Sequence, residues 1–138
     1  GIKYVEKTGN TADEVLSAAN ALAAAKVDAV FTPTDNTIMN SAAAVGEIFA
    51  EAGIPHYTGA DSFVTAGCFA TCGVNYTDLG TYTADMALEI LQGGAVPTFH
   101  VMDGGIITVN KETAQKLSID PSVFSSLAGQ VVEVDTAA

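Results

Sequence analysis

The sequence predicts an α/β fold, a Rossmann-like three-layer α/β/α sandwich with a mainly parallel sheet. Two observations predict it: short apolar strand patterns alternate with helical patterns along the chain, and the connections between them are short. Successive parallel strands need helical crossovers, which place helices on both faces of the sheet. The 138 residues suit one domain, and a hydrophobic share of 49% is enough for a packed core.

The first part of the chain contains three strand patterns separated by two helices. Residues 2–6 (IKYVE) predict a short strand. Thr11 and Glu14 are spaced as a capping box, which predicts a helix whose apolar face carries Val15, Ala18, Ala19 and Leu22. Residues 28–33 (DAVFTP) are nearly all apolar, as in a strand buried on both faces. A second helix is predicted before Gly53 and a strand over 54–58, the helix from the spacing of Ile38, Ala42, Val45, Phe49 and Ala52.

The second part continues the alternation of strand and helix patterns and then ends in a predicted hairpin, a short helix and a tail. A short turn or single helical turn follows Asp61, and residues 68–74 predict another buried strand. Thr77 is placed to cap a third helix, whose apolar side carries Leu79, Tyr82, Met86 and Ile90. Residues 99–103 and 106–109 flank two glycines, which predicts a β-hairpin. Asn110 is expected to cap a short helix through Leu117, and residues 121–138 are expected to form a surface tail.

The charge balance excludes nucleic acid as a partner. Asp and Glu number 16 and Lys and Arg 5, all five being Lys, so the formal net charge is -11. Nucleic-acid binding depends on a basic face that releases counterions, and no such face can be built here. The Ala-rich stretches are interrupted by Asn20, Lys26 and Asp28, so no membrane-spanning run is predicted.

The sequence predicts no catalytic residue, metal site or cofactor. Cys68 and Cys72 have no histidine at a metal-binding spacing, since His56 and His100 lie elsewhere. In a strand, residues four apart lie about 13 Å from each other, which is too far for a disulfide. Both cysteines are therefore predicted to be buried small hydrophobic residues. Hydrolase, nucleotide-binding and zinc-protease motifs are all missing from the sequence.

The strongest candidate site follows the strand over 28–33. Parallel sheets bind ligands at the carboxyl ends of their strands, so the residues after each strand are the ones to compare. Here they are Thr34, Asp35, Asn36 and Thr37, which lead directly into a helix. Free backbone N–H groups at a helix start favour an anion such as a carboxylate. The alternative is that one of these residues simply caps the helix.

A second candidate group follows the next strand. Asp61 and Ser62 come soon after residues 54–58, and Asp61 would lie near Asp35 if the two strands are neighbours. Two carboxylates at one sheet edge suit a ligand ammonium group or sugar hydroxyls. The alternative is an ordinary turn or cap aspartate.

Several ordered segments resemble one family. They are PTDN at a strand end, GADS followed by AG, GVNYTDLG with its following helix, and the late VN and TAQKL segments. Together, over residues 1–120, they resemble the solute-binding proteins of ABC transporters of the TrpX-like group, which have type I periplasmic-binding topology. The resemblance implies that residues 1–120 are an incomplete C-terminal lobe and that the first lobe of the longer family members is missing.

The resemblance also implies a function. A two-lobed protein of this kind traps a small solute, best matched here by an amino acid and with aromatic amino acids among the group's ligands, and delivers it to ABC permease subunits. Thr34, Asp35, Asn36 and Thr37, with Asp61 and Ser62, would line the cleft. The location implied is extracytoplasmic, periplasmic or lipid-anchored at the cell surface.

One helix is expected to pack against the missing lobe. In this topology residues 77–93 would cross back and pack on the first lobe, so their apolar face would be exposed in this chain. The chain would then self-associate or dock this helix back on itself. Two other readings remain open. Type I binding folds also serve as ligand-sensing effector domains of transcriptional regulators, and a cytosolic doubly wound enzyme domain would share the same strand and helix pattern.

Overall fold

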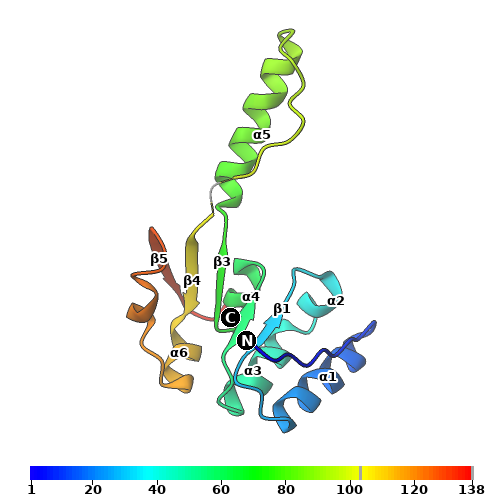
Figure 1. The fold of residues 1–138 in the computed structure, drawn as a ribbon, viewed down its shortest axis with the longest axis vertical. Helices are drawn as coiled ribbons and strands as arrows, with labels where there is room; N and C mark the ends of the chain where they lie inside the picture. The colour runs from blue at the N-terminus through cyan, green and yellow to red at the C-terminus, as the bar shows by residue number, and fades with distance from the viewer. Residues whose placement is uncertain (103, 138) are drawn as a thin grey trace.

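The sheet contains five strands in the order β1-β2-β3-β4-β5 (Figure 1). The computed structural model describes residues 1–102 and 104–137. β1, β2 and β3 pair in parallel, β4 is antiparallel to β3, and β5 is parallel to β4. The strands are β1 (Val30–Thr32), β2 (His56–Thr58), β3 (Ala70–Gly73), β4 (Ile106–Asn110) and β5 (Gln130–Val134).

At least one helix lies between every two consecutive strands. They are α1 (Ala12–Ala24), α2 (Asn36–Met39), α3 (Ala42–Glu51), α4 (Asp61–Thr65), α5 (Tyr76–Leu91), α6 (Lys111–Leu117) and the 3-10 helix η1 (Pro121–Phe124). Successive strand residues point to opposite faces, and each face has its own core. One core joins α1, α3 and β1 through Val15, Ala19, Val30, Val45 and Phe49. The other joins β4 to α6 and η1 through Ile107, Val109, Ala114, Leu117 and Phe124. The predicted three-layer α/β/α class is confirmed.

The first predicted strand is wrong. Residues 2–6 belong to no strand and are exposed, with Ile2 at 98% and Tyr4 at 87%. A strand needs a neighbour for its backbone hydrogen bonds, and none of the described residues pairs with this segment. The capping box that follows is confirmed in part, because Thr11 Oγ1 accepts from the Glu14 N–H at 3.3 Å while Glu14 Oε2 accepts from the Asn10 N–H at 2.7 Å.

Two further expectations in the first part need correction. The strand β1 is not buried on both faces, because Phe31 is 68% exposed on the face opposite Val30. The helix expected from Ile38 to Ala52 is divided into α2 and α3. The division follows from a tight turn, in which the Ser41 N–H bonds to the Ile38 carbonyl, three residues back, and ends the α2 ladder.

The helix α5 projects away from the sheet, and residues 92–102 run back along it (Figure 1). We call this unit, residues 76–102, the arm. Its N-cap is Asn75 and not Thr77, because Asn75 Oδ1 accepts from the Thr77 N–H at 2.8 Å and the Asp78 N–H at 3.2 Å. Within the arm the rings of Tyr82 and His100 stack at 3.9 Å, so the returning segment partly covers the expected apolar stripe.

The predicted hairpin around Gly104 and Gly105 does not form. β4 pairs with β3, not with residues 99–102, which belong to no strand. The last residue of the predicted first strand of the hairpin, Asp103, lies outside the described residues. The helix after Asn110 is confirmed, with Asn110 Oδ1 accepting from the Thr113 N–H at 2.9 Å.

The expected surface tail is also wrong for most of its length. Residues 121–138 contain η1 and β5, and β5 pairs with β4 along its whole length. Beyond β5, the Ala137 N–H bonds to the Thr65 carbonyl at 2.8 Å, and Lys111 forms an ion pair with Asp135 at 3.0 Å. The sequence gives only a weak signal for β5, because the segment QVVEV has only five residues.

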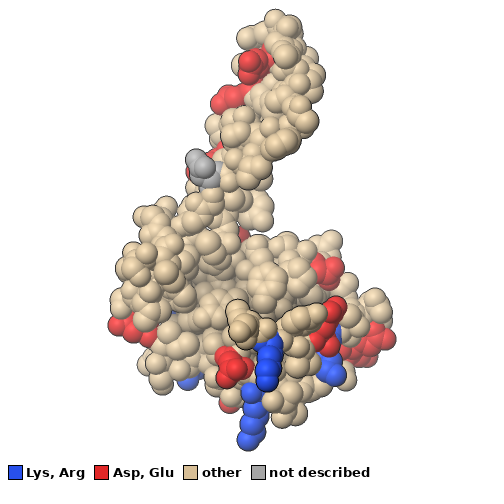
Figure 2. All heavy atoms as spheres, viewed as in Figure 1, with Lys and Arg blue, Asp and Glu red and all other residues tan. Residues whose placement is uncertain are grey.

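The two cysteines differ, against expectation. Cys68 is fully buried, while Cys72 is exposed, because the Cys72 position falls near the end of β3. Both are free thiols in this structure. Figure 2 shows acidic side chains on the arm and on the body, with Lys side chains at the end of the body away from the arm. Across the described residues, every helix is too short or too polar to cross a lipid bilayer.

Candidate functional site

Three loops leave the sheet at one edge because β1, β2 and β3 run in parallel. They are residues 33–37 after β1, 59–62 after β2 and 74–77 after β3. Ligands of open α/β sheets bind at this carboxyl edge, where loop side chains converge. All six residues predicted from the sequence lie in the first two of these loops.

The first two loops pack against each other. Their strands are neighbours, with Thr32 opposite Thr58. A Cβ atom on Gly59 would lie 2.9 Å from the Thr34 backbone nitrogen and would also meet Thr34 Oγ1. The loop after β2 can therefore approach the loop after β1 this closely only because residue 59 has no side chain.

Asp35 acts as a helix cap. Its Oδ1 atom accepts from the Thr37 N–H at 2.8 Å and the Ile38 N–H at 3.0 Å, which satisfies the first free donors of α2. Thr34, Asp35 and Asn36 are exposed and Thr37 is half-buried. The capping alternative is thus realised for Asp35, and the two N–H groups it caps are not free for an anion.

Asp61 has a different environment. It is the first residue of α4, whose N-cap is Ala60, and its carboxylate makes no hydrogen bond to any described residue. Asp61 and Ser62 are both exposed. The cap reading therefore does not hold for Asp61, whose carboxylate stays open to solvent and to a ligand.

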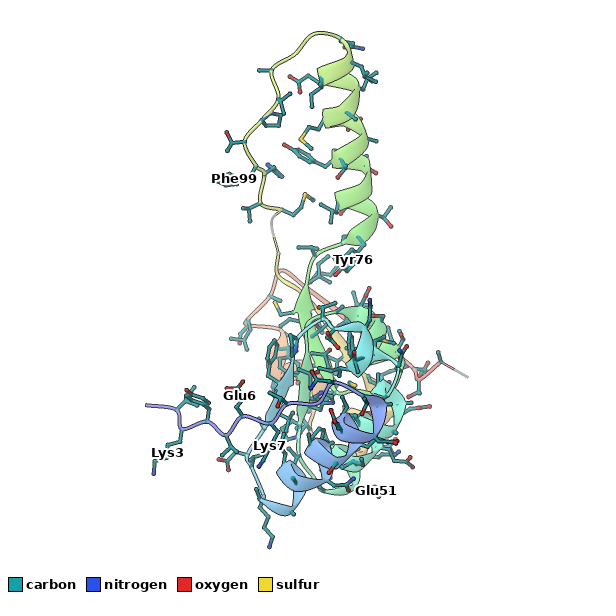
Figure 3. The ribbon with its side chains drawn as sticks, turned by 90° about the vertical axis from the view of Figure 1, so that its right-hand side faces the viewer. Lys3, Glu6, Lys7, Glu51, Tyr76 and Phe99 are labelled. Carbon is teal, nitrogen blue, oxygen red and sulfur yellow. The ribbon has the colours of Figure 1, made fainter. Side chains whose placement is uncertain are left out.

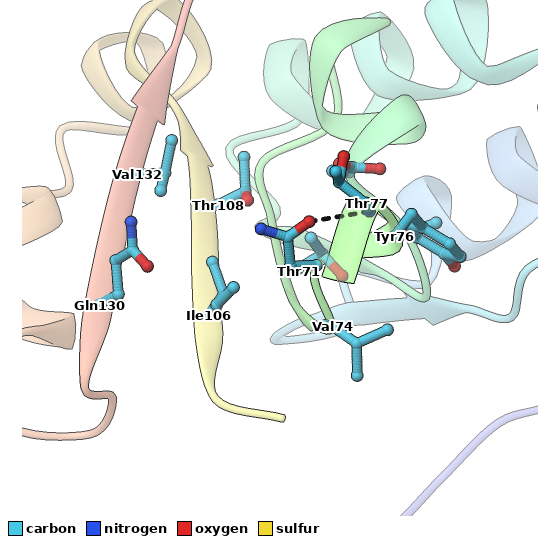
Figure 4. A pocket seen from close by; sticks show the side chains of 12 residues that line it. Thr71, Val74, Tyr76, Thr77, Ile106, Thr108, Gln130 and Val132 are labelled. Carbon is cyan, nitrogen blue, oxygen red and sulfur yellow. Dashed lines mark hydrogen bonds between the residues drawn. The ribbon is translucent and has the colours of Figure 1, made fainter. Parts of the chain in front are cut away.

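Asp61 lines a pocket of about 270 Å³, which we call the α5 pocket. Figure 4 shows this pocket from close by. Its other walls come from the end of β3 and the start of α5, with Asn75, Tyr76 and Thr77. Its floor is the sheet surface of β4 and β5, including Ile106, Thr108, Gln130 and Val132. Thr108 is 7% exposed, and its hydroxyl makes no hydrogen bond to the residues described here.

Asp35 and Thr37 face another hollow. A groove of about 540 Å³ is lined by both of them, by residues 5–10, by β1 and by the apolar face of α1. Asp35 and Asp61 therefore line separate hollows. The expectation that they lie on neighbouring strand ends is confirmed, but the α5 pocket is lined by Asp61 without Asp35, and the groove is lined by Asp35 without Asp61.

Sequence reasoning missed several pocket residues. The rule applied to the first two strand ends also selects Asn75, Tyr76 and Thr77 after β3, and the GVNYTDLG segment contains all three. Thr108 and Gln130 had no comparable signal, because they lie within strands and reach the pocket only through the pairing of β4 with β3 and β5.

A buried histidine lies next to the first two loops. His56 is 1% exposed, its Nε2 atom shares a hydrogen bond of 2.9 Å with Thr32 Oγ1, and its ring meets Phe49 edge-on at 5.1 Å. Burial lowers the pKa of His56 to about 4, since the charged imidazolium loses its hydration. His56 is therefore neutral near pH 7 and acts as a packing and hydrogen-bonding residue.

The chemistry of the α5 pocket is that of binding. It offers one free carboxylate, amide groups from Asn75 and Gln130, hydroxyl groups from Thr77 and Thr108, and apolar surface from Ile106 and Val132. A carboxylate with hydrogen-bonding groups and apolar floor suits a small solute that carries a cation and an apolar part. Within residues 1–102 and 104–137, no cluster of three His, Cys, Asp or Glu side chains is placed to hold a metal ion.

Comparison with known proteins gives a consistent result. The family model described as ABC transporter substrate binding protein matches residues 1–132. A tyrosine-binding protein of Clostridioides difficile (strain R20291) is 35% identical over 125 residues, which are 86% of this chain and 36% of that protein.

Solved structures of substrate-binding proteins are also similar to this chain. The ligand-free, open structure of a substrate binding protein with adhesive properties from Clostridium difficile is 33% identical, with a TM-score of 0.77 over 99% of this chain and 45% of that one. An ABC domain in complex with L-Trp from Streptococcus pneumoniae is 31% identical, with a TM-score of 0.72 over 90% of this chain and 43% of that one.

The chain thus spans less than half the length of the relatives it matches. The family model nevertheless matches residues 1–132, and the two clostridial relatives are 35% and 33% identical to the chain. The chain belongs to the ABC transporter substrate-binding protein family.

Proposed function

We propose that the chain forms one lobe of the extracytoplasmic solute-binding component of an ABC importer, and that it binds an aromatic amino acid. The observation that carries the proposal is the α5 pocket, which combines the unpaired Asp61 carboxylate with polar groups and apolar surface at the carboxyl edge of the sheet. The names of the relatives support the ligand class, since one is a tyrosine-binding protein and another is in complex with L-Trp.

Different polar groups of the pocket bind the ammonium group and the carboxylate of the ligand. Asp61 is the counter-ion for the α-ammonium group, because its carboxylate is exposed and uncommitted. The ligand carboxylate takes hydrogen bonds from the Asn75 side-chain amide and the Thr77 hydroxyl, since the α2 N–H groups are already capped by Asp35. Thr34, Asn36 and Ser62 are exposed on the same edge and contact the solute from the side that a second lobe would close.

The arm provides the connection to a second lobe. No residue of α5 is buried, and apolar side chains on the arm remain exposed, including Leu88 at 55%, Leu91 at 84% and Val96 at 75%. Phe99, which Figure 3 labels, is 78% exposed. A projecting helix with uncovered apolar surface needs a partner in the functional protein. We assign that role to the other lobe of the protein. The two-lobed protein then delivers the solute to permease subunits in the membrane. The setting is outside the cytoplasm, in a periplasm or anchored by lipid at the cell surface.

Ligand titration tests the proposal. The ¹⁵N-labelled chain is titrated with L-tyrosine, L-tryptophan and L-leucine, and amide shifts are followed. We expect saturable shifts at residues 60–62, 73–77 and 106–108 for the two aromatic amino acids, with millimolar dissociation constants because one lobe buries only part of the ligand.

Variants identify the residues. Asp61→Asn is expected to weaken binding about tenfold by removing the counter-ion of the ammonium group. Asp13→Asn, on the exposed first turn of α1, is the matched control and is expected to leave binding unchanged. Absence of any saturable shift, or equal binding by Asp61→Asn, would contradict the proposal.

A further inference from the structure

The floor of the α5 pocket contains a buried hydroxyl group without a partner. Thr108 is 7% exposed, and its hydroxyl makes no hydrogen bond to the part of the chain that the structure describes. Thr71, which lies opposite Thr108 on β3, differs because its hydroxyl donates to the Thr58 carbonyl at 2.7 Å. Most buried polar groups in proteins have a hydrogen-bond partner. The Thr108 hydroxyl is therefore available to a molecule that enters the pocket.

Thr108 is one of four side chains that form this floor. In the pairing of β4 with β5, Ile106 lies opposite Gln130 and Thr108 lies opposite Val132. Figure 4 shows all four residues on these two adjacent strands. The two polar residues thus lie on one diagonal of the floor and the two apolar residues on the other, since residues two apart in a strand point to the same face. The floor can therefore contact an apolar group and a polar group of the same ligand.

The groups assigned to the charges of the ligand lie at one end of the pocket. Asp61 follows β2, and Asn75 and Thr77 follow β3, while β4 and β5 are the next two strands of the sheet. Neighbouring strands are about 4.8 Å apart, so the floor lies roughly 5 to 10 Å to the side of β3. A ligand whose ammonium group and carboxylate are bound at the ends of β2 and β3 therefore extends its side chain across the floor.

The chemistry of the floor suits an aromatic ring that has a hydroxyl group. Ile106 and Val132 offer apolar surface to a ring. The Thr108 hydroxyl and the Gln130 amide can each donate and accept a hydrogen bond, and a phenol hydroxyl can do the same. A ring without a hydroxyl would displace water from Thr108 and supply no hydrogen bond in return, which weakens binding.

We propose that Thr108 and Gln130 are specificity-determining residues, which recognise a hydroxyl group on the ring of the ligand and make the chain prefer L-tyrosine to L-phenylalanine. The inference rests on the proposed function, because it takes the orientation of the amino acid from Asp61, Asn75 and Thr77. It adds the part of the pocket that distinguishes one aromatic side chain from another, and it assigns this task to strands that follow the arm in sequence.

Parallel titrations of the ¹⁵N-labelled 138-residue chain with L-tyrosine and L-phenylalanine test the inference. We expect the dissociation constant of L-tyrosine to be about tenfold lower, as one additional hydrogen bond would give. Thr108→Val keeps the shape of the side chain and removes the hydroxyl, so it is expected to reduce this preference to less than about twofold and to leave the binding of L-phenylalanine as in wild type. Thr108→Ser keeps a hydroxyl and is expected to keep the preference.

Urea unfolding separates this role from a structural one. Thr108→Val loses no hydrogen bond within the described chain and is expected to be at least as stable as wild type, whereas the matched control Thr71→Val loses its bond to Thr58 and is expected to unfold at lower urea concentration while keeping the preference for L-tyrosine.

Gln130 is exposed, so Gln130→Leu carries the same test should Thr108→Val fail to fold, and it is expected to reduce the preference severalfold. Equal binding of the two amino acids by wild type, or an unchanged preference in the folded Thr108→Val or Gln130→Leu variants, overturns this inference and leaves the proposed function intact. Binding of neither amino acid overturns both.

Discussion

Gly59 and Thr34 lie in direct contact, and this contact joins the loops that follow β1 and β2. A Cβ atom at position 59 would lie 2.9 Å from the Thr34 backbone nitrogen. The two predicted groups of ligand-binding residues are therefore positioned by one close approach between a glycine and a backbone segment, at the end of the pair formed by Thr32 and Thr58.

Gly59→Ala is expected to lower the free energy of unfolding by about 1 to 3 kcal/mol, since the added methyl group must displace the Thr34 backbone. Urea unfolding at neutral pH measures the change, and amide shifts at residues 33–37 are expected to accompany it. Gly80→Ala is the control, because nothing lies within 4 Å of a Cβ there and α5 gains a better helix former. Equal stability of Gly59→Ala and wild type would show that the loops move apart without cost.

The stability of the chain is expected to fall as the pH is lowered from 6.5 toward 4. The pKa of His56 is lowered to about 4 in the folded chain, so the unfolded chain binds a proton first. The stabilisation is complete above pH 6.5 and is lost through this range, with a total of about 3 kcal/mol. Urea unfolding at a series of pH values measures it. His56→Gln should flatten the dependence, whereas His100→Gln, on the arm, should leave it as in wild type.

Asn110 is expected to be the most sensitive polar residue of the core. Its side chain is fully buried, donates to the Val64 carbonyl at 2.9 Å and to Thr136 Oγ1 at 3.0 Å, and caps α6. Asn110→Ala leaves the Val64 carbonyl and the Thr113 N–H without these partners, so we expect a loss of about 2 to 3 kcal/mol in thermal or urea unfolding. Thr136→Ala, which removes only the exposed partner, should cost less than 1 kcal/mol by the same measure. Similar losses for both would contradict this assignment.

Thiol labelling is expected to distinguish the two cysteines. Cys72 is exposed, while burial raises the pKa of the Cys68 thiol to about 12. A thiol reagent near pH 8 should therefore react with one equivalent in the native chain and with a second only after unfolding. Cys72→Ser should remove the native reaction completely. Rapid labelling of two thiols in the native state would show that the Cys68 environment opens.

Self-association through the arm is expected at high protein concentration. Leu88 and Leu91 are 55% and 84% exposed, and exposed apolar side chains of this kind favour contact between copies of the chain. Sedimentation analysis should show a concentration-dependent increase in mass that the double substitution Leu88→Lys and Leu91→Lys reduces. Lys substitution at Ala12 and Asp13, exposed on α1, serves as a surface control. A monomer at every concentration would contradict the expectation.

Local sequence determined much of the fold. The capping signals at Thr11 and Asn110 are realised, and the apolar runs place β1, β2 and β3 where expected. These features depend on residues a few positions apart, so they can be recognised without knowledge of the rest of the chain. The same local rule located Asp35 and Asp61 at neighbouring strand ends.

The tertiary structure alone decided which segments pair and which side chains share a hollow. β4 pairs with β3 rather than with the preceding residues, and residues 2–6 pair with none of the described strands. Hydrogen bonding between strands is set by neighbours distant in sequence, and a strand pattern carries no information about which neighbour is present. For the same reason the sequence selected both Asp35 and Asp61, while only the packing of α2 and α4 decided that one carboxylate caps a helix and the other faces the α5 pocket.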